Sequence, residues 1–300
     1  MSQAPWPRPL QPGDSIRLAA ASSALSPEGL ERLQAGMAVL ESWGLQVVPH
    51  AEPLRRWGHL AGSDQQRLAD LAADAPLLAC LRGGWGAARL LETAPAVPQA
   101  PGPEPWLLGF SDVTSLLWAR AAQGRPGGIH GPLVTTLAAE PAWSQQRLRE
   151  LLFGGAPAAL PPLAGEAWCG GVATGPLLVG NLTVATHLLG TPHLPDLRGA
   201  VLVLEDVGEA PYRLDRLLTH WRLCGALQQL AAIGFGQFSD CDDPGSPTDG
   251  ETVLRERTQD LGIPVLAGLP VGHEPGNAAL PLGRLARLDA EAGQLELLPA

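Results

Sequence analysis

The sequence predicts an α/β protein in which a mostly parallel α/β sandwich domain is followed by a smaller, β-rich C-terminal domain. Strand-like and helix-like segments alternate through the first half of the chain, which is typical of a parallel sheet with helices on both faces. The second half instead contains long apolar runs and ends in a hairpin pattern. A length of 300 residues also exceeds the roughly 100–200 residues of a usual single domain.

The elements of the first half follow from apolar spacing and capping residues. Residues 15–21 predict a buried strand, and Ser26 with Pro27 predicts the start of a helix that stops at Gly44. Residues 45–49 form the next strand, and Ser63 with Gln66 makes a capping box that opens the next helix. The alternation continues with a strand at 77–81, a helix at 87–94, a strand at 106–110 and a helix at 112–122.

A segment rich in Pro, Gly and Ala, residues 154–166, separates the two halves and is the predicted linker. The expected domains are therefore residues 1–153 and 167–300. In the second of these, apolar runs occupy 201–205 and 264–272, and residues 285–299 alternate around a Gly turn as a hairpin does.

Composition and charge exclude several classes of partner. Thirty acidic and twenty basic side chains give a net charge of −10, the wrong sign for a nucleic-acid-binding or membrane-surface protein. No window approaches the roughly 18 apolar residues of a membrane span, and the N-terminus does not resemble a signal peptide. The cysteines are far apart and form no C-x-x-C pair, so we expect reduced thiols in a cytoplasmic protein; they are Cys80, Cys169, Cys224 and Cys241.

Ser111 lies where an apolar strand runs through Gly109-Phe110 into a helix. A serine at the carboxyl end of a parallel strand can present its hydroxyl to a ligand, and the following N–H, that of Asp112, can donate to an oxyanion. This resembles a nucleophile elbow, although the second Gly of G-x-S-x-G is absent. The alternative is that Ser111 is only an N-cap.

A second candidate is the loop Arg82-Gly83-Gly84-Trp85-Gly86, which also follows a predicted strand. Its glycines would let main-chain amides approach an anion or an oxyanion closely. A dinucleotide fingerprint does not fit, because Arg89 occupies the position of the third glycine. A plain tight turn is the other interpretation.

Glu205 ends an apolar run, and His273 lies in a Gly/Pro-rich loop after another. Taken alone, the first could be a solvated carboxylate and the second an ordinary loop histidine. Together with Ser111, however, they supply the nucleophile, base and orienting carboxylate that serine hydrolases need.

A metal site has little support in the sequence. The histidines are scattered without an H-E-x-x-H motif. Residues 240–251 imitate a calcium loop, but Pro244 occupies its fifth position and no entering helix precedes it. We therefore expect an acidic, solvated loop and no metal.

Several segments, in one order and over nearly the whole chain, resemble the LD-carboxypeptidase family, which includes murein tetrapeptide carboxypeptidases and microcin self-immunity peptidases. These segments are LRGGWGAARLL from residue 81, GFSDVT from 109, HGP from 130, GTPHLPDLRGAVLVLEDVGEAPYRLDRLL from 190 and GHEPGNAALPLG from 272. The resemblance implies a serine peptidase that removes terminal D-alanine from murein tetrapeptides during peptidoglycan recycling, without a cofactor and commonly as a homodimer.

The resemblance also assigns roles to residues. It implies that Ser111 is the nucleophile, His273 the base and Glu205 its orienting partner. The implied oxyanion donors are the backbone N–H groups of Gly84 and Asp112.

Substrate contacts are less specific. A carboxypeptidase must hold a free carboxylate, and the candidates are the guanidinium groups of Arg82, Arg89 and Arg213; each could instead be a surface charge. Two departures from the family pattern, Trp85 for Tyr or Phe and Val179-Gly180-Asn181 for G-G-N, lie where the substrate pocket is expected.

Two alternatives remain. The first is a self-immunity peptidase acting on a peptidyl nucleotide, whose aromatic loop before G-G-N has only Trp168 as a counterpart here. The second is a non-catalytic nucleotide or peptide binder that uses the glycine-rich loop.

Overall fold

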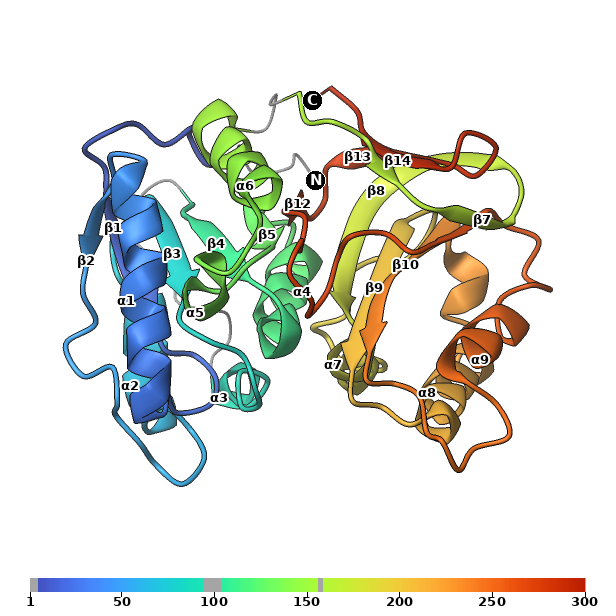
Figure 1. Ribbon diagram of the computed structural model, residues 1–300, viewed down its shortest axis with the longest axis horizontal. Coiled ribbons are helices and arrows are strands. Elements are labelled where there is room, and N and C mark those ends of the chain that lie inside the picture. The colour runs from blue at the N-terminus through green and yellow to red at the C-terminus, as the bar shows by residue number, and fades with distance from the viewer. Residues whose placement is uncertain (1–4, 94–103, 156–158, 300) are drawn as a thin grey trace.

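Two β-sheets with their covering helices lie side by side in the computed structural model (Figure 1), which describes residues 5–93, 104–155 and 159–299. The fold class predicted from the sequence, a mostly parallel α/β domain followed by a β-rich domain, is confirmed.

The first sheet has the strand order β12-β5-β4-β3-β1-β2. Strands β1 to β5 pair in parallel. They are Ser15–Ala19, Gln46–Val48, Leu77–Cys80, Trp106–Gly109 and Gly128–His130. Every residue of β3 and β4 is buried, as expected for central strands covered on both faces.

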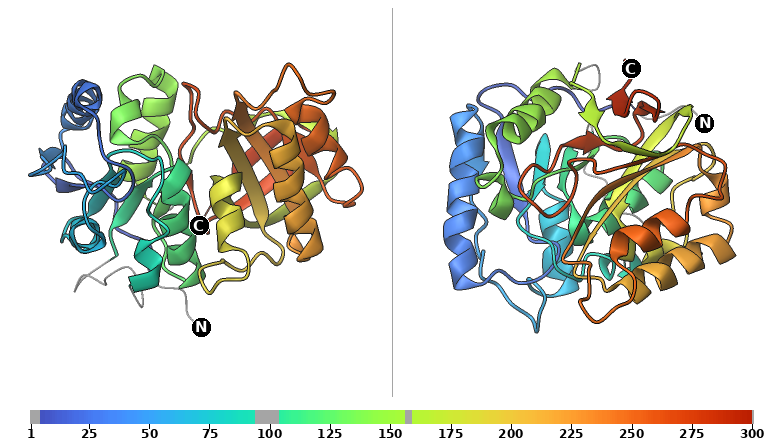
Figure 2. Two further views of the ribbon diagram at one scale, coloured as in Figure 1. Left: turned by 90° about the horizontal axis from the view of Figure 1, so that it is seen from below. Right: turned by 45° about the vertical axis from the view of Figure 1, so that its right-hand side comes forward.

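Helices cover both faces of this sheet, with α1 (Pro27–Ser42) and α6 (Ala142–Gly154) on one and α2 (Asp64–Leu71) and α4 (Thr114–Ala122) on the other (Figure 2). The predicted caps are confirmed. Ser26 Oγ accepts from the Gly29 N–H at 3.3 Å, and Ser63 with Gln66 forms the capping box. The short helix α5 (Val134–Leu137) packs against α1.

Two predicted helices differ from the structure. The helix expected over 87–94 is reduced to α3 (Leu90–Thr93), and residue 94 lies outside the described residues. The helix expected over 112–122 begins as a 3₁₀ turn, η1 (Ser111–Val113), before α4. Each of these helices comes after a strand and a loop of the predicted site. In these loops the backbone is not α-helical, so the regular helix begins later than expected.

The second sheet has the order β6-β14-β13-β8-β9-β10-β11-β7. Strands β8 to β11 pair in parallel and the others antiparallel. In chain order the strands β6 to β11, β13 and β14 are Leu163–Ala164, Glu166–Cys169, Val172–Asn181, Val201–Val207, Ala232–Ser239, Val265–Ala267, Leu285–Asp289 and Gln294–Leu297; the helices are α7 (Leu182–Leu188), α8 (Pro211–Leu223), η2 (Leu227–Gln229) and α9 (Gly250–Glu256).

The C-terminal hairpin predicted over 285–299 is confirmed by the pairing of β13 with β14. The apolar run 264–272 is only partly strand, because β11 ends at Ala267 and the rest is loop. The predicted linker contains β6, and its residues 156–158 lie outside the described part of the chain.

One strand from the second half of the chain belongs to the first sheet. β12 (Leu280–Pro281) belongs to the predicted C-terminal domain but pairs antiparallel with β5, with Leu280 opposite His130. A side chain also links the two halves: Trp118 Nε1 of α4 donates to the Val179 carbonyl of β8 at 2.8 Å. The chain therefore crosses back to the first sheet between β11 and the final hairpin.

Candidate active site

Ser111 comes just after β4, with Phe110 between them, and has a φ of +60°, in the left-handed region. Such a conformation costs a non-glycine residue roughly 1–3 kcal/mol and persists where the surrounding structure imposes it, commonly at functional sites. The same strained strand-to-helix turn exposes the nucleophile in α/β-hydrolases. Ser111 is not the N-cap of η1, because Phe110 occupies that position, and Phe110 makes no side-chain cap.

His273 and Glu205 meet Ser111 from the second half of the chain. His273 Nε2 lies 3.2 Å from Ser111 Oγ, and His273 Nδ1 lies 2.6 Å from Glu205 Oε2. Glu205 lies near the end of β9 and its side chain is fully buried. The structure thus brings the three predicted residues together in the order serine, imidazole, carboxylate.

Two opposing effects act on the imidazole of His273. Burial alone would lower its pKa, but the hydrogen bond and the charge of Glu205, with a further contribution from the charge of Asp206, raise the pKa above the usual 6.5. The Asp206 carboxylate itself faces α7, where it accepts from Asn181 Nδ2 at 2.8 Å and Thr183 Oγ1 at 2.7 Å. Because the effects of Glu205 and Asp206 outweigh burial, the imidazole of His273 binds a proton more readily than a free histidine does.

Phe110 separates His273 from a second histidine. Its ring lies 4.8 Å from the ring of His273 and 5.7 Å from that of His130. His130 is fully buried, and burial, together with the charge of His273, lowers its pKa to about 3. His130 is consequently neutral at physiological pH.

The glycine-rich loop after β3 lies against Ser111. A Cβ on Gly83 would lie 3.1 Å from Ser111 Oγ and 3.7 Å from the Asp112 backbone nitrogen. Gly84 has a φ of +106°, a conformation that glycine adopts without strain. The Asp112 carboxylate ties the loop to the serine turn by accepting from the Ala87 N–H at 2.8 Å. The two predicted oxyanion donors, the N–H groups of Gly84 and Asp112, therefore belong to loops that contact each other.

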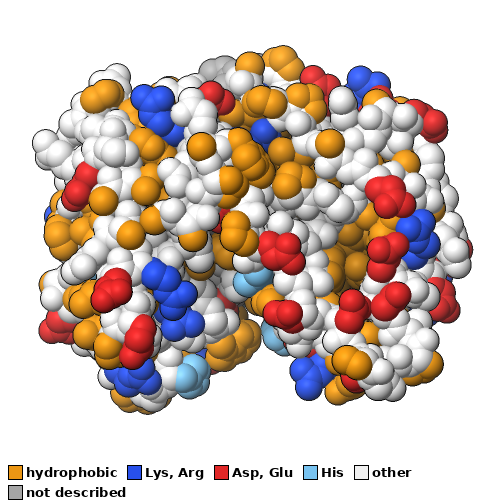
Figure 3. Space-filling model, viewed as in Figure 1, with side chains coloured by type: hydrophobic (Ala, Val, Ile, Leu, Met, Phe, Trp, Pro, Cys, Tyr) orange, Lys and Arg blue, Asp and Glu red, His pale blue; other side chains and the backbone are white. Residues whose placement is uncertain are grey.

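A pocket of about 400 Å³ opens beside Ser111. Figure 3 shows the surface hollowed between the two halves, with histidine side chains visible in the hollow. Two arginines, Arg32 and Arg82, line the pocket. Among the described residues, no carboxylate lies within 4 Å of either guanidinium group, so neither forms an ion pair there. Its lining is Leu25, Ser26, Gly29, Arg32, Arg82, Gly83, Gly84, Phe110, Ser111, Leu133, Thr135, Thr136, Val207 and His273.

The other predicted substrate residues lie outside this pocket lining. Arg89 pairs with Asp64 at 3.3 Å, and Arg213 pairs with Glu209 at 3.6 Å. Trp85 is 39% exposed, with its ring edge-on to His187 at 5.3 Å. Asn181 is buried and caps α7 through Val184 N at 3.0 Å. Of the predicted substrate residues, only Arg82 lines the described pocket beside Ser111. Arg32 lines the same pocket but was not predicted, because an arginine on an exposed turn of a helix has no distinguishing pattern in the sequence.

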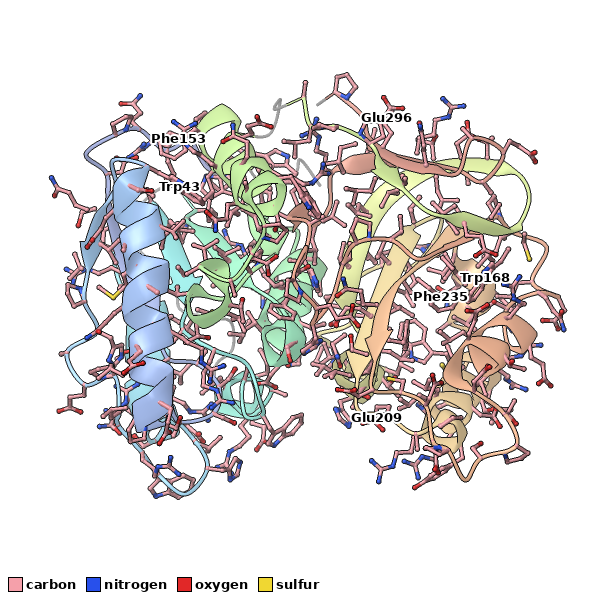
Figure 4. All side chains as sticks on the ribbon, in the orientation of Figure 1. Trp43, Phe153, Trp168, Glu209, Phe235 and Glu296 are labelled. Atoms are coloured by element: carbon pink, nitrogen blue, oxygen red, sulfur yellow. The ribbon has the colours of Figure 1, made fainter. Side chains whose placement is uncertain are left out.

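Trp168, the aromatic residue considered for a nucleotide-binding loop, lies on β7 at the outer edge of the second sheet. Its ring packs 5.6 Å from that of Phe235, on the side of the sheet away from the first half (Figure 4). Arg255 covers the ring at 4.3 Å. Trp168 is absent from the lining of the Ser111 pocket.

The calcium-like loop uses its carboxylates internally. Asp242 Oδ1 accepts from Gly250 N and Asp243 Oδ1 from Gly245 N, both at 2.9 Å, while Asp249 Oδ1 caps α9 at 2.7 Å. Within the described ranges, no group of three or more His, Cys, Asp or Glu side chains is arranged to hold a metal ion.

Family models match both halves of the chain. The LD-carboxypeptidase N-terminal domain matches residues 16–131, and the LD-carboxypeptidase C-terminal domain matches residues 174–288. These matches include Ser111, Glu205 and His273.

Individual relatives agree with the family models. A predicted carboxypeptidase of Synechocystis sp. is 46% identical, covering 97% of each chain. The murein tetrapeptide carboxypeptidase of Pseudomonas aeruginosa is 37% identical, covering 93% of this chain and 94% of its own.

Solved structures extend the similarity to the fold. The crystal structure of muramoyltetrapeptide carboxypeptidase from Oxalobacter formigenes matches with a TM-score of 0.79 and 26% identity, covering 94% of this chain and 97% of its own. The wild-type apo microcin C7 self-immunity protein MccF matches with a TM-score of 0.86 over 98% of both chains, at 20% identity. At that identity the second match concerns the fold alone.

Proposed function

The chain belongs to the LD-carboxypeptidase family and is a serine-type carboxypeptidase; we propose that it removes terminal D-alanine from murein tetrapeptides. The scissile bond would join the L-centre of the diamino acid to D-Ala. The observation that carries the proposal is the continuous contact from Glu205 through His273 to the strained Ser111. The relative from Pseudomonas aeruginosa, named for this substrate, supports the choice of peptide.

In the proposed reaction, His273 Nε2 takes the proton of Ser111 Oγ while the oxygen attacks the carbonyl carbon of the scissile bond. The tetrahedral intermediate collapses to an acyl-enzyme, and the protonated imidazole gives its proton to the departing amine of D-Ala. Water then attacks the ester with the same base, releasing the tripeptide and restoring Ser111. His273 carries the proton in each transfer, so no metal or cofactor enters the scheme.

Glu205 would select the reactive tautomer of His273. With Nδ1–H donating to Glu205 Oε2 at 2.6 Å, the lone pair of Nε2 faces Ser111. The carboxylate also stabilises the imidazolium that forms in each step. The N–H groups of Gly84 and Asp112 would donate to the oxyanion, as their position on the two loops at Ser111 allows.

We propose Arg82 as the anchor for the free carboxylate of D-Ala. Its side chain is held by Nη1 donating to the Ala24 carbonyl at 3.0 Å, and it contributes to the pocket without a carboxylate partner within 4 Å among the described residues. Arg32 lies in the same pocket and would attract the anionic substrate. Arg89 and Arg213 are engaged by Asp64 and Glu209 and are weaker candidates.

The cellular setting is part of the same proposal. We place the enzyme in the cytoplasm, in peptidoglycan recycling, as a homodimer. Unpaired thiols at Cys80, Cys169, Cys224 and Cys241 are compatible with a reducing compartment. Across the described ranges, no helix has the length and apolar character needed to cross a bilayer.

The decisive experiment is mass spectrometry of murein tetrapeptide after incubation with wild-type protein, Ser111→Ala and a matched control, Ser42→Ala. Among the described residues, the Ser42 side chain bonds only to the Val39 carbonyl of its own helix. Loss of one alanine with the wild type and Ser42→Ala, but not with Ser111→Ala, is expected. Equal loss with all three would reject Ser111 as nucleophile. No loss with any would reject the peptide as substrate and favour a peptidyl nucleotide.

The carboxylate anchor is tested with a tetrapeptide whose C-terminus is amidated. Amidation should lower kcat/KM of the wild type about 10–100-fold, the value of a charge-assisted pair of roughly 1.5–3 kcal/mol. In Arg82→Met the free acid and the amide should react at similar rates. If amidation still lowers kcat/KM of Arg82→Met as much as that of the wild type, another group binds the carboxylate.

A further inference from the structure

The loop that carries His273 is attached to both halves of the molecule. On its N-terminal side it is held by β10, where Gln237 N donates to the Val271 carbonyl and Gln237 Oε1 accepts from Glu274 N, both at 2.8 Å. Beyond Glu274 the chain leaves the second sheet and runs to β12 on the first. His273 thus lies where the chain passes between the two sheets.

A single buried carboxylate holds the far side of this loop. Oε2 of Glu140, on the first half of the chain, accepts from Gly276 N at 2.7 Å and from Asn277 N at 2.9 Å. Glu140 is only 8% exposed. Hydrogen bonds are electrostatically stronger in a buried site of low dielectric than in water. The pair of bonds is therefore a firm attachment between the halves.

Helix α6, which begins just after Glu140, adds further attachments. Ser144 Oγ donates to the Asn277 carbonyl at 2.7 Å, and Arg147 Nε donates to the Ala279 carbonyl at 3.1 Å. Asn277 Oδ1 accepts from Gly272 N at 3.2 Å and so closes the loop around His273. A displacement of residues 276 and 277 would consequently be transmitted to His273.

We propose that Glu140 is a positioning residue that sets the distance between His273 Nε2 and Ser111 Oγ. This inference rests on the proposed function, because it takes His273 as the base of Ser111. Ser111 opens η1, just after β4 of the first sheet, and Glu205 lies in β9 of the second. Glu205 lies in β9, and the N-terminal side of the His273 loop is bonded to β10, so the contact between His273 and Glu205 lies on the side of the second sheet, away from Glu140. The contact between His273 and Ser111 crosses from one sheet to the other, and Glu140 bonds across the same boundary.

The test compares Glu140→Ala and Glu140→Gln with wild type and with Glu150→Ala. Glutamine keeps one oxygen that can accept both N–H groups. Glu150, on the helix α6 that begins just after Glu140, is a matched control and contacts Gln146. Two rates are measured: kcat for the tetrapeptide, and the rate constant for phosphonylation of Ser111 by a fluorophosphonate, each normalised to the amount of titratable serine.

Glu140→Ala should lower both rate constants about 10–100-fold, because a displacement of about 1 Å at a catalytic group costs about 10²-fold. KM should change less than about threefold, and Glu140→Gln should retain most of the wild-type rate. The low-field proton signal of His273 Nδ1–H, identified by its loss in His273→Asn, should persist in Glu140→Ala, because the bond to Glu205 remains. A general loss of structure would instead lower the amount of titratable serine and erase that signal.

Wild-type rates in a folded Glu140→Ala protein would overturn the proposal, as would equal losses in Glu140→Ala and Glu140→Gln. If Glu140→Ala does not fold, Ser144→Ala removes one bond to the same loop and should lower the phosphonylation rate about threefold or more; an unchanged rate there also overturns it. Failure of the proposed function gives a different result, since Ser111 of the wild type would then not be labelled or the tetrapeptide not cleaved.

Discussion

At the residue scale, the site is defined by three side chains whose surroundings differ sharply. Ser111 is held at a positive φ, Glu205 is fully buried, and His273 remains partly exposed with 21% of its side chain open to solvent. Burying the carboxylate strengthens its interaction with the imidazole, because the local dielectric is low. Exposure of the imidazole leaves Nε2 accessible from the pocket.

The raised pKa of His273 predicts an acid limit on activity. The imidazole must be neutral to accept the Ser111 proton, and its pKa lies above 6.5. Activity should therefore fall as pH decreases through that raised pKa, so kcat/KM should show an acid limb with an apparent pKa above 6.5. In Glu205→Gln the limb should move to lower pH, since the charge that raises the pKa is gone, and the plateau should fall. A limb that does not move would show that another group titrates.

Gly83 should be essential for activity but not for stability. Its φ is not in the left-handed region, yet an added Cβ would lie 3.0 Å from Ser111 Cβ and 3.1 Å from Ser111 Oγ. Gly83→Ala should lower kcat/KM by about 10²-fold, the effect of roughly 1 Å of misplacement, with a small change in melting temperature. Gly245→Ala is the control, because among the described residues its Cβ would meet only Asp243 Oδ1, at 3.4 Å. Full activity in Gly83→Ala would mean that the pocket at Ser111 is wider than described.

At the element scale, α1 is held by its close approach to α5. Gly36 faces α5, and a Cβ there would lie within van der Waals overlap of the Val134 carbonyl oxygen. The first turns of the same helix supply Ser26, Gly29 and Arg32 to the pocket. The packing of α1 therefore determines one wall of the pocket.

Gly36→Ala should destabilise the protein by about 3 kcal/mol, because backbone atoms of two helices must separate to admit a methyl group. Urea unfolding followed by circular dichroism measures the change. Gln34→Ala, on the exposed side of α1, should alter the free energy of unfolding by less than about 0.5 kcal/mol. Equal stability of Gly36→Ala and wild type would contradict the contact between α1 and α5.

At the scale of the whole molecule, the two sheets meet along α4, β8 and β12, and the candidate site lies at this junction. His130 illustrates the consequence. It ends β5, pairs with Leu280 of β12, and is fully buried where the strand from the second half closes over it. Folding therefore removes a titratable group from water through an interaction between distant segments.

The buried His130 predicts a stability that depends on pH. Its pKa is about 3 in the folded protein and near 6.5 when unfolded, so the unfolded chain binds the proton first as pH falls. Its contribution to stability is therefore present above 6.5 and is lost between pH 6.5 and 3, by about 1.4 kcal/mol per pH unit. The free energy of unfolding of His130→Ser should decrease less steeply over pH 6.5–4.5 than that of wild type. His59→Ser, at an exposed position, should keep the wild-type slope. Parallel slopes for all three proteins would show that folding does not lower the pKa of His130.

Features that depend on residues close together along the chain could be predicted from the sequence. The cap at Ser26, the capping box at Ser63 and the final hairpin are formed by residues a few positions apart, whose spacing predicts them directly. The residues of the candidate site could also be selected, because parallel strands bring their carboxyl ends to one edge and polar residues that follow such strands stand out. The family-specific motifs narrowed that selection further.

How distant segments of the chain meet depends on the tertiary packing and could not be predicted in the same way. Ser111 and His273 are 162 positions apart and touch because the two sheets meet along α4, β8 and β12, an arrangement that no periodicity encodes. The same packing keeps Arg82 at the pocket beside Arg32 and leaves Arg89 and Arg213 bound to other carboxylates. Local patterns reflect the contacts of one helix or strand with its surroundings, whereas the geometry of a site between two sheets depends on the packing of all of them.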